Sequence, residues 1–148
     1  MVFVHARGDT FRTARGLRTS AQQLGHMAYF RNEDNSSVKM CLKKIQKSSD
    51  SAIKDLVPDG FACHHAGMLR VDRSLVEKLF ADGYIRVLVC TATLAWGVNL
   101  PAHAVIIKGT RVYKAEKSDF DNLDVLDVLQ VSVYLFICVC VFVMAIIS

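Results

Sequence analysis

The stretch Val87-Leu-Val-Cys-Thr-Ala-Thr-Leu-Ala-Trp-Gly-Val-Asn-Leu-Pro-Ala102 joins an apolar run to a polar loop that contains a glycine. The run Tyr84–Cys90 predicts a buried strand, and a threonine follows directly where that strand ends. Hydroxyl groups and backbone N–H groups at a strand end can hold phosphate oxygens without discriminating between bases. A tight strand-to-loop turn explains the same pattern without any ligand, so this segment alone leaves both interpretations open.

Three further apolar runs predict strands of the same kind: Met1–His5, Phe61–His64 and Ala104–Ile107. Strands that alternate with helices and stay apolar throughout indicate a parallel sheet covered on both faces. The sequence therefore predicts an α/β domain of three layers. Its parallel sheet is expected to have at least four strands and to be incomplete at the C-terminus.

Capping residues and glycines set the expected limits of the first helix. Asp9 or Thr10 is expected to cap a helix that runs to about Gln23 and stops at Gly25. Farther along the chain, Pro58-Asp59-Gly60 predicts the turn that leads into the second strand.

Two more helices are expected between the strands. A lysine-rich amphipathic helix is predicted over Val38–Leu56, and Ser48–Ser51 is expected to break it into two. Another helix is predicted to begin at an Asp72 cap and to stop at Gly83.

Polar or glycine-containing residues follow each of the four predicted strands. They are His5-Ala-Arg7, His65-Ala-Gly67, Thr91-Ala-Thr93 and Lys108-Gly-Thr110. In a parallel sheet the carboxyl ends of the strands share one edge, and ligands gather there. We therefore expect these four groups to form one binding edge.

The composition is that of a mildly basic globular domain. The formal net charge is +4, and every charged residue lies in residues 1–130. This balance suits a partner with phosphates but does not demand one. The five cysteines show neither a C-x-x-C pair nor zinc-type spacing, which predicts reduced thiols in an intracellular protein of the nucleus or cytoplasm.

Three segments of the chain resemble known sequence motifs. Val2-Phe-Val-His-Ala-Arg7 resembles motif IV of superfamily-2 helicases. Phe61–Arg73 is similar to the segment that follows in the Ski-like DExH branch, and Cys90–Ala102 resembles the motif V of that branch. The likeness covers roughly residues 1–130. It implies the second, C-terminal RecA-like lobe of an ATP-dependent RNA or DNA helicase.

The resemblance also implies which residues contact nucleic acid. His5, Arg7 and Thr91 match positions that touch the backbone of the tracking single strand, and His65 and Gly67 are weaker carry-overs to the same role. Contacts to the backbone suit a translocating channel, because readout of bases would stall movement. For His65, a turn histidine bonded to the backbone is an equally good interpretation.

On the nucleotide side, the resemblance places Gly97 and Asn99 facing ATP, which the intact parent enzyme uses with Mg²⁺. Trp96 could stack on a base, although packing within the loop is the simpler interpretation. The lysines of Val38–Leu56 form a solvated face in the simpler interpretation and flank the nucleic-acid path in the alternative.

A metal site is not expected, although Cys63, His64 and His65 look like a cluster of ligands. On a strand, His64 points away from its two neighbours, and no fourth ligand is near in the sequence. No metal ligand and no catalytic residue is therefore assigned.

Several parts of a helicase motor are absent from this sequence. It contains no G-x-x-x-x-G-K-[ST] loop and no D-E-x-H motif, and the arginines of motif VI do not follow Gln130. We expect the chain alone neither to bind ATP tightly nor to be active. Activity would need the first RecA-like lobe. The parent enzyme could belong to a multi-subunit complex. The alternative function is a non-catalytic module, from a truncated product, that binds nucleic acid or a partner.

Residues 131–148 form an apolar tail without charge. One interpretation is translated intron, because Gln130-Val-Ser132 can be encoded by an exon end and splice donor. The other is a membrane anchor, which we favour less because the preceding stretch is acidic rather than basic.

Overall fold

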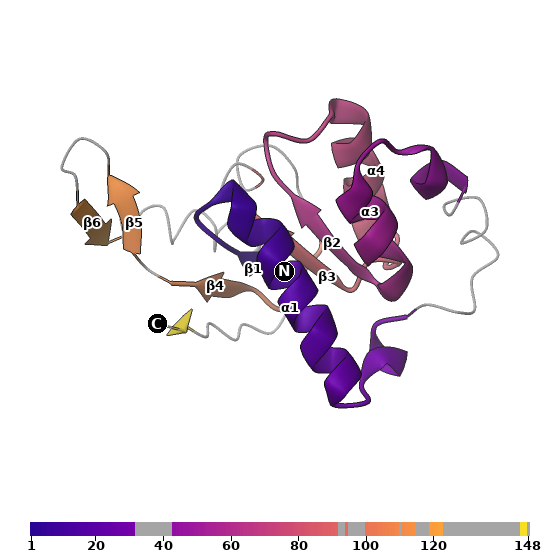
Figure 1. The fold of residues 1–148 in the computed structure, drawn as a ribbon, viewed down its shortest axis with the longest axis horizontal. Coiled ribbons are helices and arrows are strands. Elements are labelled where there is room, and N and C mark those ends of the chain that lie inside the picture. Colours follow the sequence, from indigo (N-terminus) through magenta and orange to yellow (C-terminus); the bar gives the residue numbers. More distant parts are fainter. Residues whose placement is uncertain are drawn as a thin grey trace.

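The computed structural model describes residues 1–31, 43–91, 94 and 100–109, and the backbone of residues 111–114, 119–122 and 146–147. Its main sheet has the order β2 (Phe61–His64), β3 (Val87–Cys90), β1 (Val2–Phe3), β4 (Ile106–Lys108) and β7 (Ile146–Ile147). All neighbouring pairs in this sheet are parallel. The predicted parallel α/β sheet is thus confirmed (Figure 1).

The helices and turns alternate with these strands. They are α1 (Arg7–Gln23), η1 (Met27–Tyr29), α3 (Ser51–Leu56), η2 (Val57–Asp59) and α4 (Arg70–Ala81), and residues 43–47 are also helical. An antiparallel pair that the sequence did not suggest, β5 (Arg111–Lys114) with β6 (Asp119–Asn122), lies beyond β4.

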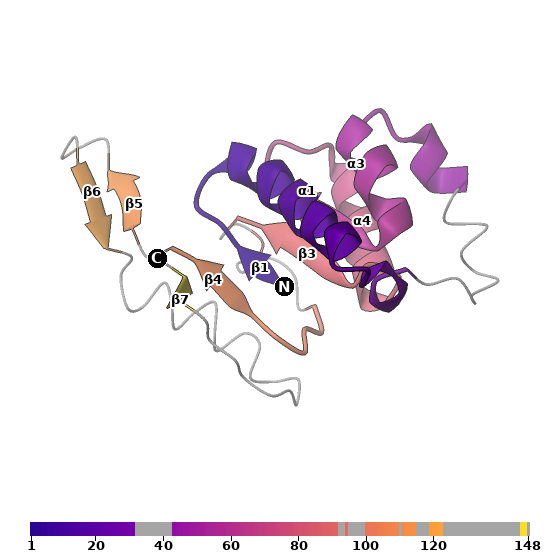
Figure 2. The same cartoon turned by 60° about the horizontal axis from the view of Figure 1, so that its bottom comes forward.

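Two apolar clusters lie on the two faces of the sheet, as alternation along a buried strand requires. Val2 and Val4 of the first strand segment pack in one cluster with Ala14 of α1. Phe3, between them, packs in the other with Val76 of α4. Figure 2 shows α1 crossing the sheet. Helices therefore cover both faces, which makes the three expected layers.

The predicted caps of α1 and α4 are wrong. The N-cap of α1 is Ala6 and that of α4 is Leu69, and neither makes a side-chain cap hydrogen bond. Thr10 is buried and donates its hydroxyl to the Arg7 carbonyl at 2.7 Å. Asp72 is buried as well and accepts from Ser48 Oγ at 2.7 Å. Thr10 thus bonds back to the first turn of its own helix, and Asp72 has a tertiary partner, so neither side chain acts as a cap.

The lysine-rich segment is interrupted as predicted. Residues 43–47 and α3 are separate helices, and Asp50 caps α3 by accepting the Ala52 N–H at 2.8 Å. Residues 38–42 of the predicted helix lie outside the described part of the chain.

The turn before β2 contains the expected left-handed glycine. Gly60 has a φ of +85°, and a Cβ there would collide with the backbone carbonyl of Phe30. Its carbonyl accepts the N–H groups of Arg86 and Val87 at 2.8 and 3.1 Å. Gly60 therefore connects the start of β2 to the start of β3.

The third strand begins later than predicted. The N–H groups of Tyr84 and Ile85 both donate to the Leu79 carbonyl at the end of α4, at 2.9 and 3.1 Å. These two residues therefore belong to the end of the helix, and β3 starts at Val87.

Among the helices that the structure describes, none is long and apolar enough to cross a membrane.

Candidate nucleic-acid interface

The register of the sheet brings four strand ends together. Phe3 lies level with Cys90 and with Ile107, and Cys90 lies level with His64. The residues that follow these four positions therefore share one edge, which we call the carboxyl edge: residues 4–7, 65–67, 91 and 108–109.

His5 connects the ends of β1 and β4. Its Nε2 lies 2.7 Å from the carbonyl oxygen of Gly109, 104 residues away in the chain. Because a carbonyl only accepts, Nε2 carries the proton and donates it. Gly109 has a φ of +80°, which favours glycine at this position. The imidazole of His5 is thus oriented by the backbone of a neighbouring strand end.

Arg7, the first residue of α1, reaches across to the loop after β2. Its guanidinium lies so close to Gly67 that a Cβ on that residue would be 2.5 Å from Nη1 and 2.6 Å from Cζ. Both residues are exposed to solvent. The missing side chain of Gly67 therefore makes room for the cation of Arg7.

His65 is half-buried beside this cation. Burial, and then the charge of Arg7, lowers the pKa of His65 below its usual value. The imidazole is therefore neutral at pH 7. The backbone carbonyl of His65 accepts the N–H of Met68 at 3.1 Å, so the main chain turns here. The buried Nδ1 of the His65 ring has no hydrogen-bond partner among the described residues.

Thr91 completes the edge at the end of β3. Its N–H donates to the His64 carbonyl at 3.3 Å, and its own carbonyl accepts the N–H of Leu94 at 3.1 Å. The structure thus brings together His5, Arg7, His65, Gly67 and Thr91. Gly97 and Asn99, expected to face the nucleotide, lie outside the described residues, as does Trp96.

His64 has a different environment from its two neighbours. It is 4% exposed, and its Nε2 lies 2.8 Å from Glu77 Oε1 of α4. Burial lowers its pKa, and the hydrogen bond and charge of Glu77 oppose this effect. Cys63 interacts with Thr10 of α1, and burial raises the pKa of its thiol to about 11. In the described residues, no group of three potential metal ligands is present.

Sequence reasoning missed two partners at this site. It noted Gly109 only as part of a strand end and did not foresee that its carbonyl binds His5. It also did not foresee that Glu77 binds His64, although the spacing along α4 puts Glu77 one residue from the buried Val76 and within reach of the sheet. Both contacts join residues distant in the chain, so no local signal points to them.

The carboxyl edge therefore presents the basic side chains of Arg7 and Lys108, an imidazole donor (His5) held by a carbonyl, a hydroxyl residue and two glycines. Such groups hold phosphate and sugar oxygens, and they carry no information on base identity.

Comparison with known proteins assigns the family. Residues 19–120 match the family model of the helicase conserved C-terminal domain. The chain belongs to this family. It is 56% identical over 131 residues to activating signal cointegrator 1 complex subunit 3 of Gallus gallus, and 53% identical over 131 residues to that of Danio rerio. It is 52% identical over 130 residues to the U5 small nuclear ribonucleoprotein 200 kDa helicase of Homo sapiens.

These alignments cover 88% of the chain and 6–8% of the relatives. This member of the helicase C-terminal domain family therefore spans a small part of the length of the curated relatives it matches. The matches agree with the resemblance of its motifs to the Ski-like DExH branch.

Proposed function

We propose that the chain is part of the second RecA-like lobe of an ATP-dependent RNA or DNA helicase, and that its carboxyl edge contacts the backbone of a single strand. The observation that carries this proposal is the convergence of Arg7, Gly67 and His65. The guanidinium of Arg7 lies against Gly67 and beside His65. This is the edge of a parallel sheet at which ligands usually bind.

The roles of the residues follow from their chemistry. Arg7 offers a guanidinium fork that suits a phosphate. Gly67 leaves the room in which that guanidinium lies, and the Thr91 hydroxyl can donate to a phosphate or sugar oxygen. His65, whose pKa is lowered by burial and by the charge of Arg7, acts as a neutral hydrogen-bonding group, and His5 offers the N–H that Gly109 orients.

The nucleotide side of the proposal depends on the partner lobe. Gly97 and Asn99 would contribute one wall of the ATP cleft, and the first RecA-like lobe would supply the phosphate loop and the Mg²⁺ ligand. We propose that the chain neither binds ATP tightly nor hydrolyses it without that lobe. Two of the relatives are named as parts of larger assemblies, and membership of such a complex is part of the proposal.

The binding proposal is tested with the purified chain and fluorescent oligonucleotides of about 12 residues, U-only RNA and T-only DNA. Anisotropy titrations at several salt concentrations should show binding that weakens steadily as salt rises. Arg7→Gln should weaken it about fivefold, while Arg86→Gln, which alters an exposed arginine just before β3 at the opposite end of the sheet, should change it little. Equal loss in both variants would contradict a role for the edge.

The helicase-lobe proposal is separated from a non-catalytic module by a graft. Residues 1–130 would replace the matching 130-residue segment of the human U5 200 kDa helicase. We expect the folded chimera to keep nucleic-acid-stimulated ATP hydrolysis, and Arg7→Gln in the chimera to reduce the stimulation. A folded chimera without ATP hydrolysis would favour the non-catalytic module.

A further inference from the structure

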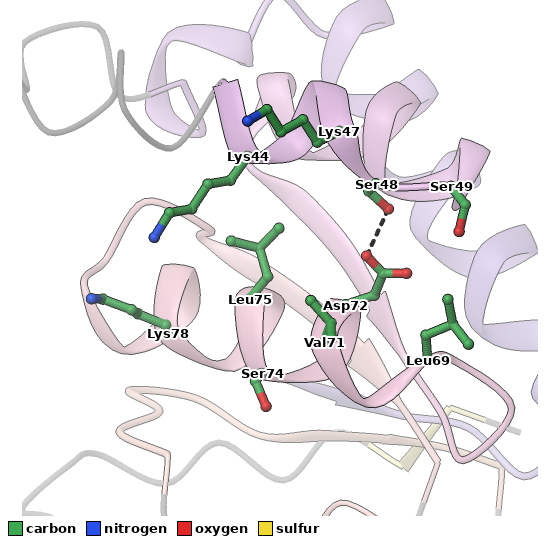
Figure 3. Close-up of a pocket in the computed structure, with 10 residues that line it drawn as sticks. All are labelled: Lys44, Lys47, Ser48, Ser49, Leu69, Val71, Asp72, Ser74, Leu75 and Lys78. Carbon is green, nitrogen blue, oxygen red and sulfur yellow. Dashed lines mark hydrogen bonds between the residues drawn. The ribbon is translucent and has the colours of Figure 1, made fainter.

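A groove of about 560 Å³ lies between the helical residues 43–47 and α4 (Figure 3). Its apolar lining comes from Leu69, Val71 and Leu75, at the N-cap and along the first turns of α4. Leu69 is 62% exposed and Val71 is 79% exposed. Large aliphatic side chains that gather at one hollow, rather than singly, mark an interaction surface.

Three lysines lie on the two walls of the groove. Lys44 and Lys47 project from the helical residues 43–47, and Lys78 projects from α4 on the opposite side (Figure 3). All three are exposed to solvent. A partner at the groove therefore meets positive charge on both sides.

The acidic residue in the lining does not offset these lysines at the surface. Asp72 is 5% exposed and accepts a hydrogen bond from Ser48 Oγ at 2.7 Å, which joins the two walls (Figure 3). Its carboxylate thus faces the seam between the helices. The groove therefore has a positive rim, and one hydrogen bond joins its two walls.

We propose that this groove binds an acidic amphipathic helix of a partner protein. The aliphatic side chains of such a helix would cover Leu69, Val71 and Leu75, and its carboxylates would pair with the lysines. A nucleic-acid backbone fits less well, because it has charge for the rim but no aliphatic surface to bury Leu69 and Val71. The proposal is independent of the function proposed for the carboxyl edge.

The test uses the full 148-residue chain and a synthetic helix of about 18 residues, with leucines spaced to form one stripe and glutamates elsewhere. Binding is followed by anisotropy of a dye on the peptide. A peptide of the same composition with the leucine stripe scrambled is the reference. The proposal expects saturable binding of the striped peptide, with an affinity at least about tenfold above that of the scrambled one.

Two groove variants should each weaken binding about tenfold: Lys44→Glu with Lys78→Glu, and Leu69→Ser with Val71→Ser. Matched exposed controls away from the groove, Lys54→Glu and Leu24→Ser, should leave affinity unchanged. Circular dichroism verifies that all variants fold.

Three results would overturn the proposal. One is equal affinity for the striped and scrambled peptides. Another is a loss with the charge variant alone, while Leu69→Ser with Val71→Ser binds normally. The third concerns the affinity of the chain for U-only RNA. If Lys44→Glu with Lys78→Glu lowers this affinity and Arg7→Gln does not, the groove binds nucleic acid instead.

Discussion

The guanidinium of Arg7 lies across the backbone of Gly67, where a Cβ would stand 2.5 Å from Nη1 and 2.8 Å from Nε. These residues come from α1 and from the loop after β2, so the contact joins two strand ends at the carboxyl edge. The far end of an arginine can move at little cost. Adding a side chain at residue 67 should therefore displace the cation and leave the fold intact.

Gly67→Ala tests this contact. We expect a change in the free energy of unfolding within about 0.5 kcal/mol, because the displaced group is a flexible, exposed end. Affinity for single-stranded oligonucleotides should fall about fivefold, since one charge-assisted contact is lost. Gly16→Ala is the control, because its Cβ would meet nothing within 4 Å, and its affinity should match the unmodified chain. Unchanged affinity in Gly67→Ala would show that the contact has no role in binding.

Gly60→Ala should instead destabilise the fold. The left-handed φ of +85° strains any side chain, and the new Cβ would collide with the Phe30 carbonyl, which is backbone and cannot move cheaply. We expect a loss of about 3 kcal/mol in urea unfolding followed by circular dichroism. Gly25→Ala isolates the effect of φ, because Gly25 has a φ of +70° with open space around it, and should cost about 1 kcal/mol. Equal losses would mean that the Phe30 contact contributes nothing.

Arg18 ties α1 to α3 through its guanidinium. Nη1 and Nη2 donate to the two carboxylate oxygens of Asp55 at 2.9 and 3.1 Å, and Nη1 also lies 3.7 Å from Asp59 Oδ2. The Arg18 side chain is 13% exposed, whereas that of Asp55 is 44% exposed, so solvent screens part of the pair. Arg18→Met should lower the free energy of unfolding by about 1–2 kcal/mol.

The matched variant for that comparison is Arg12→Met, whose side chain is 80% exposed and pairs with Asp9 at 3.2 Å. Thermal and urea unfolding should place it within about 0.5 kcal/mol of the unmodified chain. A loss as large as that of Arg18→Met would show that burial does not distinguish the two pairs.

Stability should depend on pH through His64 and His65. Burial lowers the pKa of both below the ordinary value of 6.5, so the unfolded chain takes up protons first as the pH falls. Their contribution is complete above pH 6.5 and is lost as the pH falls from there through the lowered values. We expect the free energy of unfolding to be smaller at about pH 5.5 than at about pH 7.5.

The double variant His64→Gln with His65→Gln should reduce that difference, whatever its absolute stability. His26→Gln, at the exposed N-cap of η1, should keep it. If the double variant shows the full difference, other groups are responsible for the pH dependence.

Much of the fold was predictable because a parallel sheet leaves a strong signal. Runs such as Val87–Cys90 are apolar throughout, and glycines such as Gly60 and Gly25 mark the turns. The caps were not predictable. Thr10 and Asp72 have the right chemistry for caps, but Thr10 bonds back to the Arg7 carbonyl within α1, and Asp72 accepts from Ser48, a partner that only the assembled fold shows.

The sequence was enough to predict which residues lie at the site, but not which contacts they make. Parallel strands place His5, Arg7, His65 and Thr91 at one edge, so pattern alone could gather them. That His5 binds the Gly109 carbonyl, or that Arg7 lowers the pKa of His65, depends on contacts between distant segments. Their roles in binding remain predictions, as do the limits of the domain at residue 130, the nature of residues 131–148, and the nucleotide contacts of Gly97 and Asn99.

The most direct test of the carboxyl edge is a map of where a single strand lies. A U-only RNA of about 12 residues that contains 4-thiouridine would be crosslinked to the chain by light, and the modified peptides identified by mass spectrometry. We predict crosslinks at residues 5–7 and 65–67, reduced by Arg7→Gln. Crosslinks confined to the lysines of the groove, Lys44, Lys47 and Lys78, or spread evenly over the exposed lysines and arginines, would contradict the assignment.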